Sequence, residues 1–336
     1  MKKFAVLFAL LSSLGLAQAE VGIFGTMDAG LASTKAPGAS TSTTSFTSGG
    51  MTTSNIGIKG SEDLGNGRKA IFELSSFVGD GTGATLGGST VNTFARSSFV
   101  GIADNKLGTL TLGRQSNPSF LPTILFNAYG DSGAYGPLWH ATYFGNTGNT
   151  STRVYNDTAW DNAIAYSTPS INGVTVTAMS SKTGAGQNTG ANALYFKGNL
   201  GLTAYYQRTE INSTGSFQSN IYATNQPSVA KGVGASYDLK VAKVFATYQT
   251  ADSDSANVHN KTWHTSALVP AGAGNVMLAY ANTDAKGMVV GSYKEYSVGY
   301  DYPLSKKTDV YGTVGRTDVT GLSQGQTLGA GLRVRF

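Results

Sequence analysis

Apolar and polar residues alternate with a period of two along much of the chain. In the last segment, one set of alternate positions is apolar (Leu328, Ala330, Leu332, Val334, Phe336), and the other is small or charged (Thr327, Gly329, Gly331, Arg333, Arg335). The pattern recurs near residues 21–31, 55–59, 69–74 and 295–302. Successive side chains of a β-strand point to opposite faces, so each segment predicts a strand with one apolar face. The chain is therefore expected to be all-β.

The first nineteen residues have the features of a secretion signal. Lys2 and Lys3 precede an apolar stretch, Phe4–Leu16, and Ala17-Gln18-Ala19 offers small residues for cleavage. The stretch is shorter than the ~20 residues of a membrane-spanning helix, which argues against the alternative of an anchor. We expect a signal peptide at 1–19 and one domain at 20–336.

Charge and cysteine content exclude several classes of protein. Without Lys2 and Lys3, 22 basic residues remain against 19 acidic ones, a net charge of +3. This mild excess argues against nucleic-acid binding, which calls for a concentrated basic stripe. The chain has no cysteine, so it can form neither disulfides nor thiolate metal sites.

Both a soluble β-sandwich and a membrane β-barrel alternate in this way, but two features favour the barrel. The polar faces carry large charges (Lys69, Glu73, Arg96, Lys243), which a water-filled interior accepts. Tyrosines gather at strand ends, where an interfacial girdle would place them (Tyr205, Tyr206, Tyr248, Tyr280, Tyr300, Tyr302). In this interpretation Ile56, Ile58, Phe72 and Phe99 face lipid.

The spacing of the connections gives the strand count. Short turns alternate with longer polar loops (33–50, 79–91, 116–158, 211–228, 251–260, 284–292), and all eight prolines lie in connections. Two strands of ~10 residues with a turn and a loop take about 40 residues, so Glu20–Phe336 accommodates about eight hairpins. The expected fold is a 16-stranded antiparallel transmembrane β-barrel with both termini on the periplasmic side.

Several segments resemble a known family. Asn55-Ile-Gly-Ile-Lys-Gly-Ser-Glu-Asp-Leu-Gly-Asn-Gly-Arg-Lys-Ala-Ile-Phe-Glu-Leu74, Arg96-Ser-Ser-Phe-Val-Gly-Ile102, Leu107-Gly-Thr-Leu-Thr-Leu-Gly-Arg-Gln115 and Asp161-Asn-Ala-Ile-Ala-Tyr-Ser-Thr-Pro169 are similar to segments of Gram-negative general porins of the β-proteobacterial branch. The closing Arg333-Val-Arg-Phe336 resembles the family's C-terminal strand.

The resemblance implies a water-filled channel for passive diffusion of small hydrophilic solutes and ions across the outer membrane of a Gram-negative bacterium. It also implies a homotrimer, contact with membrane lipid and lipopolysaccharide, and recognition of Phe336 by the barrel-assembly machinery. A third external loop folded inward as a constriction belongs to the same expectation.

The connection Ser116–Thr158 supports such a loop on its own residues. It is 43 residues long, and loops above ~15 residues are usually functional. It is also rich in aromatic residues, which suggests packing against an inner wall (Phe120, Phe126, Tyr129, Tyr135, Trp139, Tyr143, Phe144, Tyr155). The alternative is a surface loop folded on itself.

The resemblance implies a constriction in which basic residues on the wall face acidic groups on the loop. The candidates are Lys59, Lys69 and Arg96, inward by alternation; Arg114 and Arg153, beside or on the loop; Asp131, Asp157 and Asp161 on the loop side; and Glu73 on the wall. Asn55 and Ala165 stand where anion-selective members carry basic residues. The basic cluster is thinner for that reason, and we expect a weak to moderate anion preference that fades with salt.

Other functions remain as alternatives. Only His140, His259 and His264 offer an imidazole base, and His259 and His264 with Asp252 and Asp254 resemble the Asp/His character of outer-membrane protease barrels. A polar rim is the simpler explanation, and no enzyme activity, cofactor or catalytic metal is expected, although loop carboxylates leave weak calcium binding open. A substrate-selective channel with an aromatic slide and a non-conducting adhesin barrel complete the alternatives.

Overall fold

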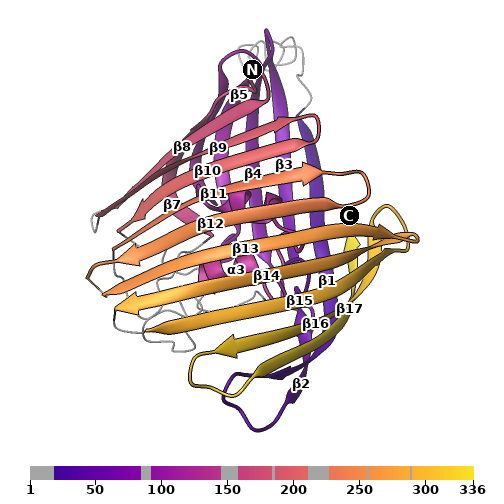
Figure 1. Cartoon of the computed structure of the whole chain (residues 1–336). Coiled ribbons are helices and arrows are strands. Elements are labelled where there is room, and N and C mark those ends of the chain that lie inside the picture. Colours follow the sequence, from indigo (N-terminus) through magenta and orange to yellow (C-terminus); the bar gives the residue numbers. More distant parts are fainter. Residues whose placement is uncertain are drawn as a thin grey trace, which may run out of the picture.

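A computed structural model describes residues 19–84, 92–144, 158–183, 186–210, 227–255, 257–287 and 290–336. The expected signal peptide thus lies almost entirely outside the described residues. The strands are β1 Glu20–Lys35, β2 Thr43–Ser48, β3 Asn55–Gly65, β4 Arg68–Phe77, β5 Ser97–Asp104, β6 Gly108–Ser116, β7 Ala159–Ser167, β8 Val174–Thr183, β9 Gly186–Lys197, β10 Leu200–Thr209, β11 Ser228–Asp238, β12 Lys243–Ser253, β13 Val258–Ala271, β14 Gly274–Gly287, β15 Gly291–Pro303, β16 Thr308–Val319 and β17 Gly325–Arg335. Figure 1 shows them wrapped around a short helix.

The strands form one closed antiparallel sheet. Each strand from β3 to β17 pairs with the next, and β17 closes on β1, where Met27 faces Val334. The other edge of β1 pairs with β3 over Glu20–Thr26 and with β2 over Ala29–Thr34, so β2 and β3 form one stave of the barrel. The seventeen segments therefore make sixteen staves, which confirms the predicted barrel. Closure leaves no open edge, as a sheet surrounded by lipid requires.

The two faces of the wall follow the alternation. In β17, Leu328 and Leu332 are exposed on the outside, whereas Arg333 points inward and is only 7% exposed. Two predicted orientations are wrong. Phe99 faces inward, because it lies opposite Glu73 while Val100 and Ile102 are exposed outside. Tyr205 also faces inward, and its neighbour Tyr206 takes the outward position.

The connections alternate between short turns and longer loops. At the turn between β3 and β4, Asn66 and Gly67 have φ angles of 55° and 79°, values that Asn and Gly adopt in tight hairpin turns. Three predicted loops are shorter than expected. Strand β2 lies within the predicted loop 33–50, β12 extends to Ser253 and β13 begins at Val258, and β14 and β15 leave only residues 288–290 between them. At the short turns, β13 runs to Ala271 and β15 to Pro303, so Pro270 and Pro303 lie at the ends of strands instead of in connections.

The densest packing lies inside the barrel. Met51, Phe245, Met277 and Tyr311 of the wall region surround Ala128, Tyr129 and Tyr135 of the long connection after β6, and all are nearly fully buried. That connection contains α2 Phe120–Leu125, α3 Pro137–Trp139 and the π-helix η2 His140–Phe144. Over the described ranges, no helix has the length and apolarity to cross a membrane.

Candidate functional site in the barrel interior

The connection between β6 and β7, hereafter the inward loop, crosses the barrel interior. Its described part, Asn117–Phe144, bonds to inward-facing side chains around the wall. The Ser119 amide donates to Gln207 Oε1 of β10 (3.1 Å), and the Ala128 amide donates to Ser266 Oγ of β13 (3.0 Å). Ser297 Oγ of β15 donates to the Tyr135 carbonyl (2.9 Å). These contacts confirm an inward fold and exclude a loop folded on itself at the surface.

The aromatic side chains of the inward loop pack against the wall. Phe126, Tyr129, Tyr135, Trp139 and Tyr143 are at most 7% exposed. The Tyr129 hydroxyl lies 3.3 Å from Thr313 Oγ1 of β16, and burial raises the pKa of Tyr129 to about 12. These rings fix the loop in place and leave little aromatic surface for a stacking slide.

Three predicted residues form a group on the inner face of the wall. Lys59 of β3 and Glu73 of β4 face each other across the two strands, and the Lys59 ammonium lies 4.9 Å from the centre of the Phe24 ring. Arg96, just before β5, donates to Glu73 Oε1 (3.3 Å) and Ser75 Oγ (3.4 Å). The Arg96 side chain is 31% exposed, so its guanidinium remains accessible from the interior.

A second pair sits where the inward loop joins the wall. Arg114 of β6 donates to Asp161 Oδ1 of β7 (2.7 Å) and to the Ala95 carbonyl, and only 8% of Arg114 is exposed. Burial and pairing leave Arg114 less accessible than Arg96. Lys69 is inward by register but faces Asp63, close to the short turn at Asn66, and therefore lies near the mouth of the barrel.

Asp131 is the predicted acid within the described part of the inward loop itself. Its Oδ1 accepts a hydrogen bond from Thr52 Oγ1 (3.0 Å), and Thr52 also accepts one from Arg333 (2.8 Å). Burial raises the pKa of Asp131 above its ordinary value, although the charges of Arg333 and Arg96 oppose the shift. Arg153 and Asp157 lie outside the described residues.

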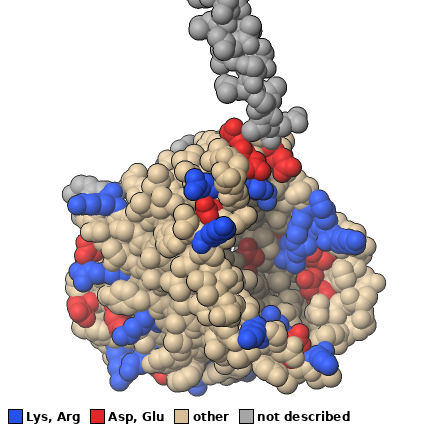
Figure 2. All heavy atoms as spheres, turned by 90° about the horizontal axis from the view of Figure 1, so that it is seen from above, with Lys and Arg blue, Asp and Glu red and all other residues tan. Residues whose placement is uncertain are grey.

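The structure also places a charge cluster that the site prediction missed. Arg333 of β17 donates to Asp309 Oδ1 (3.0 Å) and Asp301 Oδ2 (3.1 Å), and Arg335 donates to Asp309 Oδ2 (2.5 Å). The alternation of β17 had already put both arginines on the polar face, so the signal for an inward position was present. Their acidic partners come from β15 and β16, and the sequence gives no indication of that pairing. Figure 2 shows one face of the molecule hollowed, with acidic and basic side chains around the opening.

The buried carboxylate of Asp28 stabilises the segment between β2 and β3. Asp28 of β1 is fully buried and accepts hydrogen bonds from the Tyr311 hydroxyl (2.6 Å) and from the amides of Met51 (2.8 Å) and Thr52 (2.7 Å). The Gly50 carbonyl accepts a hydrogen bond from Ser132 Oγ of the inward loop (2.7 Å). The break between β2 and β3 thus receives the middle of the loop.

Comparison with known proteins identifies the family. The family model described as Gram-negative porin matches residues 5–322. The chain is a Gram-negative porin. It is 27% identical to outer membrane porin protein 32 of Delftia acidovorans, over 94% of this chain and 89% of that protein. As a member of this family with a closed barrel, it is an outer-membrane channel for diffusion.

Solved structures agree on the fold. An anion-selective porin from Comamonas acidovorans superposes with a TM-score of 0.78 at 22% identity, over 95% of this porin and all of that chain. The trimer form of OmpT from Vibrio cholerae gives a TM-score of 0.67 at 14% identity, over 95% and 99% of the two chains.

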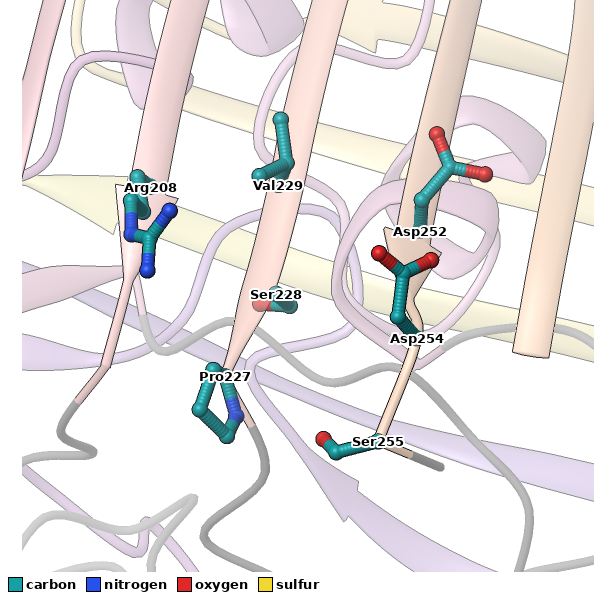
Figure 3. A pocket seen from close by; sticks show the side chains of 7 residues that line it. All are labelled: Arg208, Pro227, Ser228, Val229, Asp252, Asp254 and Ser255. Atoms are coloured by element: carbon teal, nitrogen blue, oxygen red, sulfur yellow. The ribbon is translucent and has the colours of Figure 1, made fainter. Parts of the chain in front are cut away.

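The Asp and His residues considered for an enzyme do not meet in one site of this porin. His264 points inward and is 3% exposed, whereas His259 takes the opposite face of β13 and pairs with Asp252 (3.2 Å). Asp252 and Asp254 instead border a cavity of about 260 Å³ with Arg208 (Figure 3). Over the part of the chain that is described, no three His, Asp or Glu side chains come close enough to hold a metal.

Proposed function

We propose that this porin passes small hydrophilic solutes and ions with a weak to moderate preference for anions. The observation that carries the proposal is the inner wall of β3 to β7, where three basic side chains, Lys59, Arg96 and Arg114, accompany only the two carboxylates of Glu73 and Asp161. In this proposal Lys59 and Arg96 border the constriction. Arg114 and Asp161 form an ion pair at its edge. Lys69 adds a positive charge at the mouth of the barrel. Asp131 is the opposing acid on the loop, with Asp157 as a second acid and Arg153 as a further basic residue of the same loop.

The anion-selective relative supports the direction of the preference, and the positive excess of this wall is small. Fixed charges in a water-filled passage act over the Debye length, which is ~10 Å at 0.1 M and ~3 Å at 1 M salt. The preference should therefore be clear at 0.1 M and nearly absent at 1 M.

The test is the reversal potential of single channels in planar bilayers under a potassium chloride gradient. We expect the sign of an anion-preferring channel at low salt and a value near zero at molar salt. Preference for cations at low salt would overturn the assignment of Lys59 and Arg96 to the constriction.

The assembly and partners belong to the same proposal. A homotrimer fits the trimeric relative, and chemical cross-linking of the purified protein tests it. We further propose contact with lipopolysaccharide and other lipid on the outside of the barrel, and recognition of Phe336 by the barrel-assembly machinery. An enzymatic role is not part of the proposal, and neither is a cofactor or a nucleic-acid partner.

A further inference from the structure

A cavity of about 290 Å³ lies between the inward loop and the wall. The loop contributes Ala134, Tyr135 and His140, and the wall contributes inward-facing residues of β1, β2, β15, β16 and β17. Lys35, Ala36 and Pro37 border it where β1 enters its long connection, so the cavity adjoins the long-loop end of the barrel. None of the constriction candidates lines it.

The lining of the cavity includes one carboxyl group, that of Glu295 of β15. Only 6% of Glu295 is exposed, and its Oε1 lies 2.7 Å from His140 Nδ1. The second oxygen, Oε2, is buried and has no hydrogen-bond partner among the described residues. Burying a hydrogen-bond acceptor without a donor costs free energy of folding, so a donor from another molecule would stabilise this oxygen.

The neighbouring His140 occupies one oxygen of this carboxyl group. Its Nδ1 lies 2.7 Å from Glu295 Oε1, and its Nε2 lies 2.9 Å from the Gly133 carbonyl, so the imidazole is held between the wall and the inward loop. Oε2 is left toward the cavity, where a hydroxyl group of a ligand can reach it.

The rest of the lining has the same character. Tyr135 and Tyr293 contribute aromatic rings. Most of the other polar groups are hydroxyls of threonine and serine (Thr34, Ser45, Thr47, Thr313, Thr317, Thr327). The hydroxyls of Thr47 and Tyr135 are also buried in this lining, where they neighbour each other. Hydroxyl groups that both donate and accept, beside aromatic faces and a carboxylate, suit a compact polyhydroxylated molecule.

We propose that this cavity binds a small neutral polyol of up to monosaccharide size. Ligand pockets usually measure about 300–1,000 Å³, so the cavity admits only a small member of that class. Its hydroxyls would donate to Glu295 Oε2 and exchange hydrogen bonds with the threonine and serine hydroxyls. The inference goes beyond the diffusion function, because it does not depend on ion preference.

Saturation-transfer NMR on the full-length protein in detergent tests the inference, with glucose and glycerol as probes. Thr317→Trp fills the cavity with an indole and should abolish saturable binding. Thr327→Val removes one lining hydroxyl at nearly constant shape and should weaken binding about two- to tenfold, the effect of one hydrogen bond. Thr109→Val, on the inward face of β6 away from the cavity, is the matched control and should bind like the parent protein.

Three results would overturn the proposal: no saturable binding of either probe by the parent protein, binding that survives Thr317→Trp unchanged, or stronger binding of methylammonium than of glucose. The last result would identify a cation site. The reversal potential of Thr327→Val should equal that of the parent, so failure of this inference and failure of the proposed anion preference are separate outcomes.

Discussion

Arg96 is the residue whose charge bears most directly on the proposed selectivity. Its guanidinium reaches Glu73 and stays partly exposed to the interior. Arg96→Glu should abolish or invert the anion preference, because it replaces a positive charge beside Lys59 with a second carboxylate beside Glu73. The cost to stability should stay small, since the side chain borders water, whereas a charge on the lipid face costs about 2–4 kcal/mol at the bilayer midplane. Reversal potentials and thermal unfolding of the purified protein check both parts.

Lys69→Glu serves as the control for Arg96→Glu. Lys69 is also inward but lies near the short turn between β3 and β4, so reversing the charge of this residue should change the ion selectivity less. An unchanged reversal potential in Arg96→Glu, together with poor barrel assembly, would show that Arg96 has a structural role instead.

We expect Asp131 to make the selectivity depend on pH. Its pKa is raised by burial, so its carboxylate is neutralised at a higher pH than an ordinary aspartate. As pH falls through that raised pKa, the inward loop loses negative charge, and the anion preference should grow. Reversal potentials between pH 7 and pH 4 measure the effect, and Asp131→Asn should already show the acid value at pH 7. A preference that declines on acidification in the parent protein would contradict this role.

Alternation predicted most inward and outward positions correctly, and its failures have local causes. The wall partners Lys59 and Glu73 were assigned to one face, and they lie opposite each other. Phe99 and Tyr205 were placed outside because they are aromatic, yet register puts them inside. Aromatic character alone does not decide the face when the interior contains a packed loop. The arginine–aspartate pairing of β15–β17 depends on which strands become neighbours, which residue patterns do not specify.

At the scale of elements, the inward loop crosses the interior, and we expect it to narrow the passage. The length and aromatic content of this loop were predicted from the sequence, but the part of the wall that it contacts was not. The loop contacts the break between β2 and β3, where Ser132 donates to the Gly50 carbonyl. Asp28, which is 23 residues from Met51 in the chain, stabilises this break, and no local sequence pattern indicates it. The strand ends at Ser253 and Gly287 were also missed, because polar residues there continue the ladder instead of forming loops.

Deleting Tyr129–Phe144 should raise the single-channel conductance and admit larger solutes. The deletion removes the part of the loop that crosses the interior, while Lys59 and Arg96 stay on the wall, so the sign of the ion preference should persist. It also removes Tyr129 and Tyr135 from the buried cluster with Met51, Met277 and Tyr311, and thermal stability should fall. Conductance and liposome-swelling rates with sugars of increasing size measure the passage. Tyr129→Phe, which loses only the contact with Thr313, is the control and should conduct like the parent.

At the scale of the whole molecule, closure between the first and last strands makes the barrel. The sixteen staves and the pairing of the chain's end with the first strand were predicted, because both follow from strand length and from the need to leave no open edge in lipid. Phe336 completes this seam: its amide donates to the Gly25 carbonyl (3.1 Å), and the Gly25 amide donates back to the Phe336 carbonyl (3.3 Å). A side chain at position 25 would meet the Phe336 ring, so glycine allows the ring to lie over the first strand.

Phe336→Ala separates the role of this ring in the finished barrel from its role in assembly. The backbone pairing with Gly25 does not need the ring, so the variant refolded in detergent should reach conductance and selectivity close to those of the parent protein. In cells its outer-membrane level should fall severalfold, because we expect the assembly machinery to read the terminal aromatic. Gly25→Ala is the structural counterpart: it crowds the same seam, and it should lower the thermal stability of the refolded barrel itself. Equal outer-membrane levels of Phe336→Ala and the parent would remove the assembly role and leave Phe336 as a seam residue alone.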